Sequence, residues 1–377
     1  MTDVTHAVHG LAGNREPAQW PALRPAEVSG LLADYPATGA PQRITWHSPR
    51  PLSAGCLVQC ANASVFVKRH HRSVRTVATL EEEHRFIEHL RRAGMPIPAV
   101  LRDSAGHSAH GTGDWVYEVH ACAAGVDIYR ETISWVPLAN AHHAHTAGAM
   151  LAQLHTAAAG YQAPQRDTHI LVARSELLCA ADPVAALQAQ LPQRPQLANY
   201  LQQRDWQTEL AAVLAPWHAA VQPRLAQQPR WWTHGDWHVS NLCWSSADDD
   251  ARITAVVDFG LAAATFVLFD LATAIERNAI GWLHLGRNMA AVHADIACAL
   301  IAGYRQQRVL DAAAVHLLAD LLPLVHLDFA LSEVEYFHAL ADSYKPDVAY
   351  TTFLCGHAAW FSTAPGRALL HAIHACA

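Results

Sequence analysis

Two short apolar runs separated by a polar stretch stand out near the middle of the chain. The runs are Leu242–Trp244 and Ile253–Val257, and residues 245–252 between them are charged, polar or small. Short apolar runs bounded by turn residues are typical of strands, so the pattern predicts a hairpin. Because hairpin strands run antiparallel, the residue before the first strand, Asn241, and the residue after the second, Asp258, should lie at the same edge.

Strand-like runs also fill much of residues 43–122. In one of them Phe66 and Lys68 alternate with two valines, so Lys68 should lie on the face opposite those valines. The predicted strands are Arg43–Trp46, Gly55–Cys60, Ser64–His70 and Asp114–Cys122.

A helix is predicted over residues 79–93, where Thr79 and Glu82 have the spacing of a capping box. Glu83 falls on the apolar stripe of this helix. A carboxylate on a core-facing stripe is costly unless it is paired. Lys68 is one of only two lysines in the chain, and we expect it to be the partner of Glu83.

Helical patterns dominate the rest of the chain, and a long one over residues 312–341 has a break near Pro323. A strand-rich part followed by a helix-rich part favours an α+β fold. We expect an N-terminal arm (1–24), a small lobe (25–122) with an antiparallel sheet and one main helix, and a larger, mostly helical C-terminal lobe (123–377).

Composition excludes several classes of protein. With 377 residues, 51% of them apolar and 16% charged, the chain is long and hydrophobic enough for a substantial core. The net charge of −7 argues against nucleic acid as a partner, because phosphate binding needs clustered Lys and Arg. No uninterrupted apolar run approaches the roughly 20 residues of a membrane helix. No export signal is visible, so we expect a cytoplasmic protein without a membrane partner, with its eight cysteines reduced.

The 26 histidines are an unusual number. Clusters such as His70-His71 and His142-His143 lack the spacing with an acidic residue that helices of metalloenzymes use. Surface or capping histidines in a lysine-poor chain are the favoured interpretation, and a metal role is the alternative.

The chemistry of the predicted hairpin suits phosphoryl transfer. Asp236 and Asn241 have the D-x-x-x-x-N spacing of a kinase catalytic loop, and Asp258-Phe259-Gly260 reads as the metal-binding D-F-G. Mg²⁺ prefers oxygen ligands and keeps waters and substrate phosphates in its shell, so one amide and one carboxylate suffice from the protein. The alternative is an edge hairpin with solvated carboxylates.

These residues resemble a known family. Residues 234–241, HGDWHVSN, are similar to the H-G-D-x-H-x-x-N loop of the aminoglycoside phosphotransferase and choline kinase-like family, and Asp270-Leu271-Ala272 is similar to its D-L-A. The sequence departs from the family at residues 265–267, which stand where Gly-Asp-Pro is usual, and at residues 239–240, which replace Pro-Gly. Both departures concern the acceptor side.

The resemblance implies a bilobal protein-kinase-like fold and a set of roles. Asp236 would be the catalytic base, and Asn241 and Asp258 would bind Mg²⁺. Lys68 and Glu83 would position the phosphates of ATP or GTP. The hinge between the lobes would bind adenine through backbone groups near His120 and Cys122.

The resemblance also implies a small acceptor with a hydroxyl group, such as an amino alcohol, an aminoglycoside, homoserine or a sugar. Asp328 and Glu335 are seven residues apart and share one helix face. With Tyr336 they would suit a cationic acceptor, and Trp282 and Trp360 are further candidates for an aromatic wall. A solvated acidic face over an aromatic core is the alternative.

Two other functions are consistent with the sequence. A nucleotide-binding protein with weak or no catalysis is favoured by the segment 47–55, which holds a single glycine where a phosphate-covering loop is expected. A protein Ser/Thr kinase is disfavoured because no A-P-E segment follows Gly260. The sequence leaves open a monomer or a homodimer.

Overall fold

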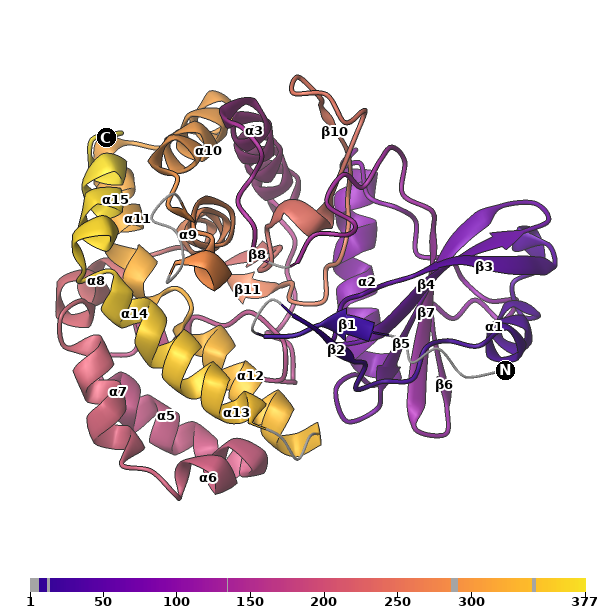
Figure 1. The fold of residues 1–377 in the computed structure, drawn as a ribbon, viewed down its shortest axis with the longest axis horizontal. Helices are drawn as coiled ribbons and strands as arrows, with labels where there is room; N and C mark the ends of the chain where they lie inside the picture. The colour runs from indigo at the N-terminus through magenta and orange to yellow at the C-terminus, as the bar shows by residue number, and fades with distance from the viewer. Residues whose placement is uncertain (1–6, 12–13, 134, 286–290, 341–343) are drawn as a thin grey trace. The chain divides into compact units, whose positions relative to one another are not determined.

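The computed structural model describes residues 7–11, 14–133, 135–285, 291–340 and 344–377 (Figure 1). The chain divides into two compact units, each described by itself. The first comprises Met1–Ser134, Leu242–Ala247 and Thr254–Val257, and the second comprises Trp135–Asn241, Asp248–Ile253 and Asp258–Ala377.

A five-stranded antiparallel sheet forms the centre of the first unit, with strand order β3-β4-β5-β7-β6. Four of these strands confirm the predicted ones. The fifth, β6, was not predicted, because its sequence AHGT has no apolar alternation. The strands are β3 (Pro41–His47), β4 (Ala54–Cys60), β5 (Ser64–His71), β6 (Ala109–Thr112) and β7 (Trp115–Ala121).

The two faces of this sheet differ as the alternation predicts. Val65 and Val67 are fully buried in a core that helix α1 (Pro25–Leu32) covers with Val28. On the other face Lys68 stands directly opposite Glu118 in the register of β5 with β7. A short hairpin, β1 (Ala7–His9) and β2 (Arg15–Pro17), lies within the segment that we expected to be an arm.

Helix α2 (Val77–Arg92) lies over the second face of the sheet, where its His84 bonds Glu118 (Figure 1). The predicted capping box of Thr79 with Glu82 is wrong. The helix begins two residues earlier, and Thr76 is the N-cap, whose hydroxyl accepts from the Thr79 N–H at 3.2 Å. The Thr79 hydroxyl accepts from the Thr76 N–H at 2.9 Å. Thr79 therefore takes the place that Glu or Gln usually has in a capping box. Glu83 is buried, as the apolar stripe predicted.

The second unit is mostly helical. Its helices α3 and α10 pack at close range, since a Cβ atom at Gly148 of α3 would overlap the Leu300 carbonyl of α10. The helices are α3 (Ala141–Ala157), α4 (Glu176–Cys179), α5 (Pro183–Gln190), α6 (Pro195–Leu201), α7 (Trp206–Leu214), α8 (His218–Leu225), α9 (Val267–Ala279), α10 (Ala294–Gln307), α11 (Ala312–Leu321), α12 (Leu327–Leu340), α13 (Lys345–Val348), α14 (His357–Trp360) and α15 (Ala364–His374).

The apolar stretch Ala312–Leu340 is long enough to cross a membrane, but it is mostly buried inside the protein. Its helical run changes to a 3-10 turn at Leu322–Leu324, which confirms the predicted break near Pro323. A core helix of a folded domain is buried to a similar extent.

Two small antiparallel pairs frame the predicted catalytic loop. Strands β8 (Trp231–Thr233) and β11 (Ala263–Thr265) pair with each other, and β9 (Leu242–Trp244) pairs with β10 (Ile253–Val256). The second pair is the hairpin that the sequence predicted. The loop between β8 and β9 carries Asp236 and Asn241.

Candidate functional site

Asp236 and Asn241 contact each other within the catalytic loop. The Asn241 side-chain N–H₂ donates to the main-chain carbonyl of Asp236 at 2.8 Å and to its Oδ2 at 3.2 Å. A 3-10 turn over Val239–Asn241 brings the amide back toward the carboxylate. Since the nitrogen faces Asp236, the carbonyl oxygen is the Asn241 atom that suits a cation.

Arg277 of α9 forms an ion pair with Asp236, Nη1 to Oδ1, and its side chain is only 4% exposed. Burial lowers the pKa of Arg277 to about 10, so the guanidinium stays charged at neutral pH. His238 Nε2 lies 3.5 Å from the other carboxylate oxygen. The sequence analysis did not identify Arg277.

Asp270 anchors the start of the catalytic loop. Its fully buried carboxylate accepts the N–H groups of His234 at 2.9 Å and Gly235 at 2.8 Å. His155 Nε2 lies 3.0 Å from the same carboxylate, and Tyr304 lies 2.8 Å from the other ring nitrogen. Burial favours the neutral acid, but the bonds from His155 and the charges nearby outweigh it and hold the pKa of Asp270 below its ordinary value.

The same helix holds the loop at a third place, where Asn278 donates to the Trp237 carbonyl at 2.8 Å. Asp270, Arg277 and Asn278 are seven and eight residues apart, which places them on neighbouring positions two turns along α9. Polar residues at that spacing in a largely apolar, buried helix are the sequence signal that would have found Arg277.

Gly235 is required in the loop for two reasons. Its φ is 76°, in the left-handed region that favours glycine. A Cβ atom there would also lie 2.6 Å from the Ala173 side chain and 2.7 Å from the Leu261 carbonyl. Both facts fix the backbone immediately before Asp236.

Asp258 follows β10, and Asn241 precedes β9, so the antiparallel pairing puts both at the same end of the hairpin. Asp258 has φ 60°, a conformation that Asp tolerates better than most residues but that still stores strain. The Phe259 ring packs against His234 with centroids 4.6 Å apart. The D-F-G segment therefore contacts the catalytic loop, as the spacing of the motifs predicted.

The residues predicted to bind the nucleotide belong to the first unit. Lys68 lies opposite Glu118 in the β5–β7 ladder, and Glu83 on α2 precedes the His84 that bonds Glu118. The pairing of Lys68 with Glu83 stays a prediction. The Cys122 N–H donates to the Ser64 carbonyl at 3.2 Å, so this donor is engaged within the sheet.

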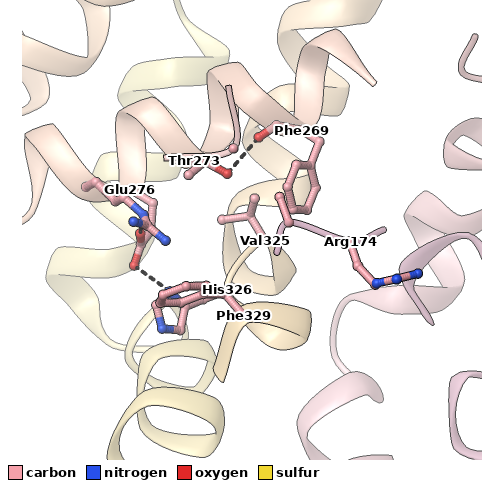
Figure 2. Close-up of a pocket in the computed structure, with 10 residues that line it drawn as sticks. Arg174, Phe269, Thr273, Glu276, Val325, His326 and Phe329 are labelled. Carbon is pink, nitrogen blue, oxygen red and sulfur yellow. Dashed lines mark hydrogen bonds and ion pairs between the residues drawn. The ribbon is translucent and has the colours of Figure 1, made fainter. Parts of the chain in front are cut away.

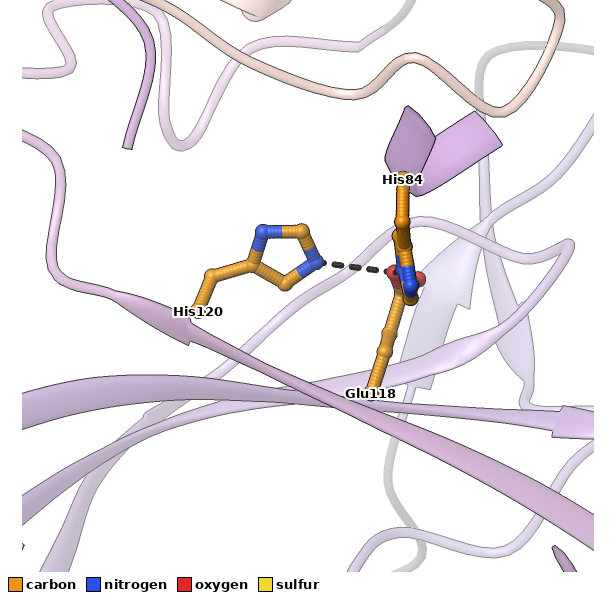
Figure 3. Close-up of side chains that lie close together, drawn as sticks. All are labelled: His84, Glu118 and His120. Carbon is orange, nitrogen blue, oxygen red and sulfur yellow. Dashed lines mark hydrogen bonds and ion pairs between the residues drawn. The ribbon is translucent and has the colours of Figure 1, made fainter. Parts of the chain in front are cut away.

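The His120 ring bonds Glu118 at 2.8 Å, and Figure 3 shows this pair beside His84. The role of His120 in the predicted hinge concerns its backbone, and the structure gives its side chain a separate partner. Adenine binding at these residues stays a prediction.

The predicted acceptor residues lie in the interior of the second unit. Tyr336 is fully buried, and Glu335 is bound by Arg194 at 2.7 Å. Asp328 is buried, and this burial raises the pKa of its carboxyl well above the usual range. These findings contradict both an accessible cationic subsite and a solvated acidic face, because helical spacing tells which residues share a face but not whether that face reaches solvent.

A small pocket lies beside the catalytic loop (Figure 2). Gly235 and Arg277 line it, which places it next to Asp236. Its lining residues combine charge of both signs with aromatic surface and come from the segment before α4, the catalytic loop, α9, the residues just before α12 and α12 itself: Ala173, Arg174, Gly235, Phe269, Thr273, Glu276, Arg277, Val325, His326 and Phe329.

The sequence model of the phosphotransferase enzyme family matches residues 56–306. A search of curated proteins found no match.

Several solved structures share the fold. An amicoumacin kinase in complex with AMP-PNP, Ca²⁺ and Ami superimposes with TM-score 0.59 at 15% identity, covering 89% of this chain and 95% of that one. A microcompartment-associated aminopropanol kinase gives TM-score 0.55 at 16% identity, with 91% and 99% covered. A choline/ethanolamine kinase family protein from Mesorhizobium loti gives TM-score 0.53 at 16% identity, with 93% and 99% covered.

Proposed function

Since the chain belongs to the phosphotransferase enzyme family, a group of enzymes that transfer phosphate to hydroxyl acceptors, we propose that it uses ATP or GTP with Mg²⁺ to phosphorylate a small molecule. One observation carries the proposal. Asp236 and Asn241 are in contact, and the D-F-G segment that holds Asp258 packs against their loop through Phe259 and His234.

In the proposed mechanism Asp236 accepts the hydrogen bond of the acceptor hydroxyl and turns its oxygen toward the γ-phosphate. Arg277 holds the carboxylate in place through their ion pair. Asp270 holds the backbone of His234 and Gly235, which come immediately before Asp236. Each of these steps is performed by residues of the second unit.

The oxygen ligands fit Mg²⁺. The Asn241 carbonyl and the Asp258 carboxylate are hard donors, and two protein ligands leave room for water and phosphate oxygens. Mg²⁺ would supply charge neutralisation at the β- and γ-phosphates. We assign Lys68 and Glu83 to the positioning of those phosphates.

For the acceptor we propose a compact polar molecule. The pocket beside Asp236 is small and offers Arg174 and Arg277 together with the carboxylate of Glu276. These groups suit an acceptor that carries both a hydroxyl and an ionised group. The aminopropanol and choline/ethanolamine kinases among the similar structures support this size class.

A nucleotide-binding protein without transfer activity is the second candidate. The Asp236 carboxylate contacts Arg277 through one oxygen and Asn241 through the other, so both oxygens already have partners. A catalytic base must release one of these partners, or share it, when the acceptor binds.

The deciding experiment measures nucleotide consumption by the purified protein against a panel of amino alcohols, hydroxy amino acids and sugars. Asp236→Asn should lower kcat by about 100-fold to 10,000-fold while nucleotide affinity stays unchanged. Asp250→Asn is the matched control, because Asp250 lies exposed in the β9–β10 turn. Nucleotide binding without turnover for every acceptor would support the second candidate. Equal turnover in Asp236→Asn and the wild type would remove the proposed role of Asp236.

A further inference from the structure

Two buried clusters in the described residues bring histidines and a carboxylate together. One consists of His84, Glu118 and His120 in the first unit, and the other of Glu276, His326 and His357 in the second. They differ in how far their nitrogen and oxygen atoms lie apart.

In the first cluster the atoms lie at hydrogen-bond distances. His84 and His120 are 2.9 and 2.8 Å from one oxygen of Glu118, and His70 is 3.0 Å from the other (Figure 3). The carboxylate is therefore satisfied by three imidazoles. This cluster needs no further group.

The second cluster is more open. Nδ1 of His326 lies 3.5 Å from Oε1 of Glu276, and Nδ1 of His357 lies 3.4 Å from the same oxygen. These contacts do not meet hydrogen-bond geometry, and within the described chain Oε1 of Glu276 and Nδ1 of His357 are buried without a hydrogen-bond partner. Buried polar atoms in native structures nearly always have one.

The spacing matches shared coordination of an ion. Bonds of about 2.0–2.1 Å in a tetrahedral zinc site place neighbouring ligand atoms about 3.3–3.4 Å apart. The distances of 3.4 and 3.5 Å around Glu276 agree with that value. Two imidazoles and one carboxylate also form a recurring zinc donor set with one coordination position left open.

Aromatic side chains hold the two imidazoles in place. Trp282 stacks on His357 with centroids 3.6 Å apart, and the Trp135 ring contacts both His326 and His357 edge to face. Trp135 has φ 64°, which a bulky residue adopts only under constraint from its surroundings. The rings are thus fixed before any ligand arrives.

We propose that Glu276, His326 and His357 bind a divalent transition-metal ion of the Zn²⁺ class. Glu276 and His326 line the pocket beside the catalytic loop (Figure 2), so a water or a ligand oxygen from that pocket would complete the coordination. This site is separate in its residues from the Mg²⁺ ligands Asn241 and Asp258, and its softer nitrogen donors select a different class of metal.

The test uses the full chain after removal of metal with a chelator. Zn²⁺ is titrated by calorimetry, and Co²⁺ is added as a spectroscopic probe of coordination geometry. We expect one tight Zn²⁺ site in the wild type, an intense four-coordinate Co²⁺ absorption band, and a higher Tm with Zn²⁺. The double variant His326→Ala/His357→Ala should bind Zn²⁺ on the order of 100-fold more weakly or worse.

A chain with many histidines also binds metals weakly at its surface, so the control removes an equal number of them. His316 and His374 form a pair of rings 5.3 Å apart on α11 and α15, and His316 is exposed. The variant His316→Ala/His374→Ala should keep the tight site and the Co²⁺ band. Equal loss in both double variants would overturn the assignment.

A second measurement needs no variant. X-ray absorption at the zinc edge of the loaded wild-type protein should show two imidazole nitrogens and a carboxylate oxygen. Six oxygen-type neighbours, or no zinc retained after dialysis, would refute the site. Because both readouts follow the metal and not phosphate transfer, their failure leaves the proposed kinase activity untouched.

Discussion

Replacing Arg277 should separate its electrostatic role from its packing role. Its guanidinium pairs with Asp236 and also lies 4.6 Å from the centre of the Phe329 ring. Arg277→Met keeps a long side chain against that ring and removes the charge. Arg277→Lys keeps the charge and loses the two-pronged shape of the guanidinium.

The magnitude follows from the contact. A hydrogen bond to a charged group contributes about 1.5–3 kcal/mol, and about 1.4 kcal/mol corresponds to a tenfold change in rate. We expect kcat of Arg277→Met to fall about 10- to 100-fold. The Asp236 side chain is 13% exposed, so water replaces part of the lost contact, and the loss of stability should lie at the low end of about 3–5 kcal/mol.

The assay is steady-state kinetics of wild type, Arg277→Met and Arg277→Lys with chemical denaturation of each. KM for the nucleotide should not change, and Arg277→Lys should recover part of kcat. Arg204→Met is the matched control, since Arg204 pairs with Asp347 and lies over Tyr200. A wild-type kcat in a folded Arg277→Met protein would refute the reasoning, as would an equal loss in the control.

Two further predictions concern stability. Asp270→Asn should cost about 3–5 kcal/mol, because it leaves a buried amide facing the N–H groups of His234 and Gly235. The pKa of Asp270 is lowered in the folded protein, so its stabilising effect is present above the ordinary Asp pKa of about 4 and is lost as the pH falls through the folded value. Denaturation of the wild type and Asp270→Asn should show that the difference between their free energies of unfolding shrinks as the pH falls. A difference that stays constant with pH would contradict this. Gly148→Ala should destabilise by at least about 1–3 kcal/mol through overlap with α10, whereas a Cβ atom at Gly30 of α1 meets nothing. Equal Tm values for Gly148→Ala and Gly30→Ala would contradict the packing argument.

The features that were predicted correctly are those set by residues close together in the sequence. The β9–β10 hairpin and the burial of Glu83 both follow from residues that lie close together in the sequence. The alternation that put Lys68 on the face opposite its valines is equally local.

Long-range contacts were not predictable in the same way. The ion pair of Arg277 with Asp236 joins residues 41 positions apart, and only the packing of α9 under the loop brings them together. Asp328 and Glu335 share a helix face as expected, but the helices around α12 bury that face. The cap of α2 was misplaced because either a hydroxyl or a carboxylate can satisfy a helix N-terminus.

The bonds of Asp270 continue beyond the loop, through His155 of α3 to Tyr304 of α10. The backbone immediately before Asp236 is thus held by residues that do not line the pocket. Under the proposed function, exchange of pocket residues other than Gly235 and Arg277 should therefore change which acceptor binds without disturbing the catalytic loop, whereas a change at the α3–α10 contact should impair turnover of every acceptor alike.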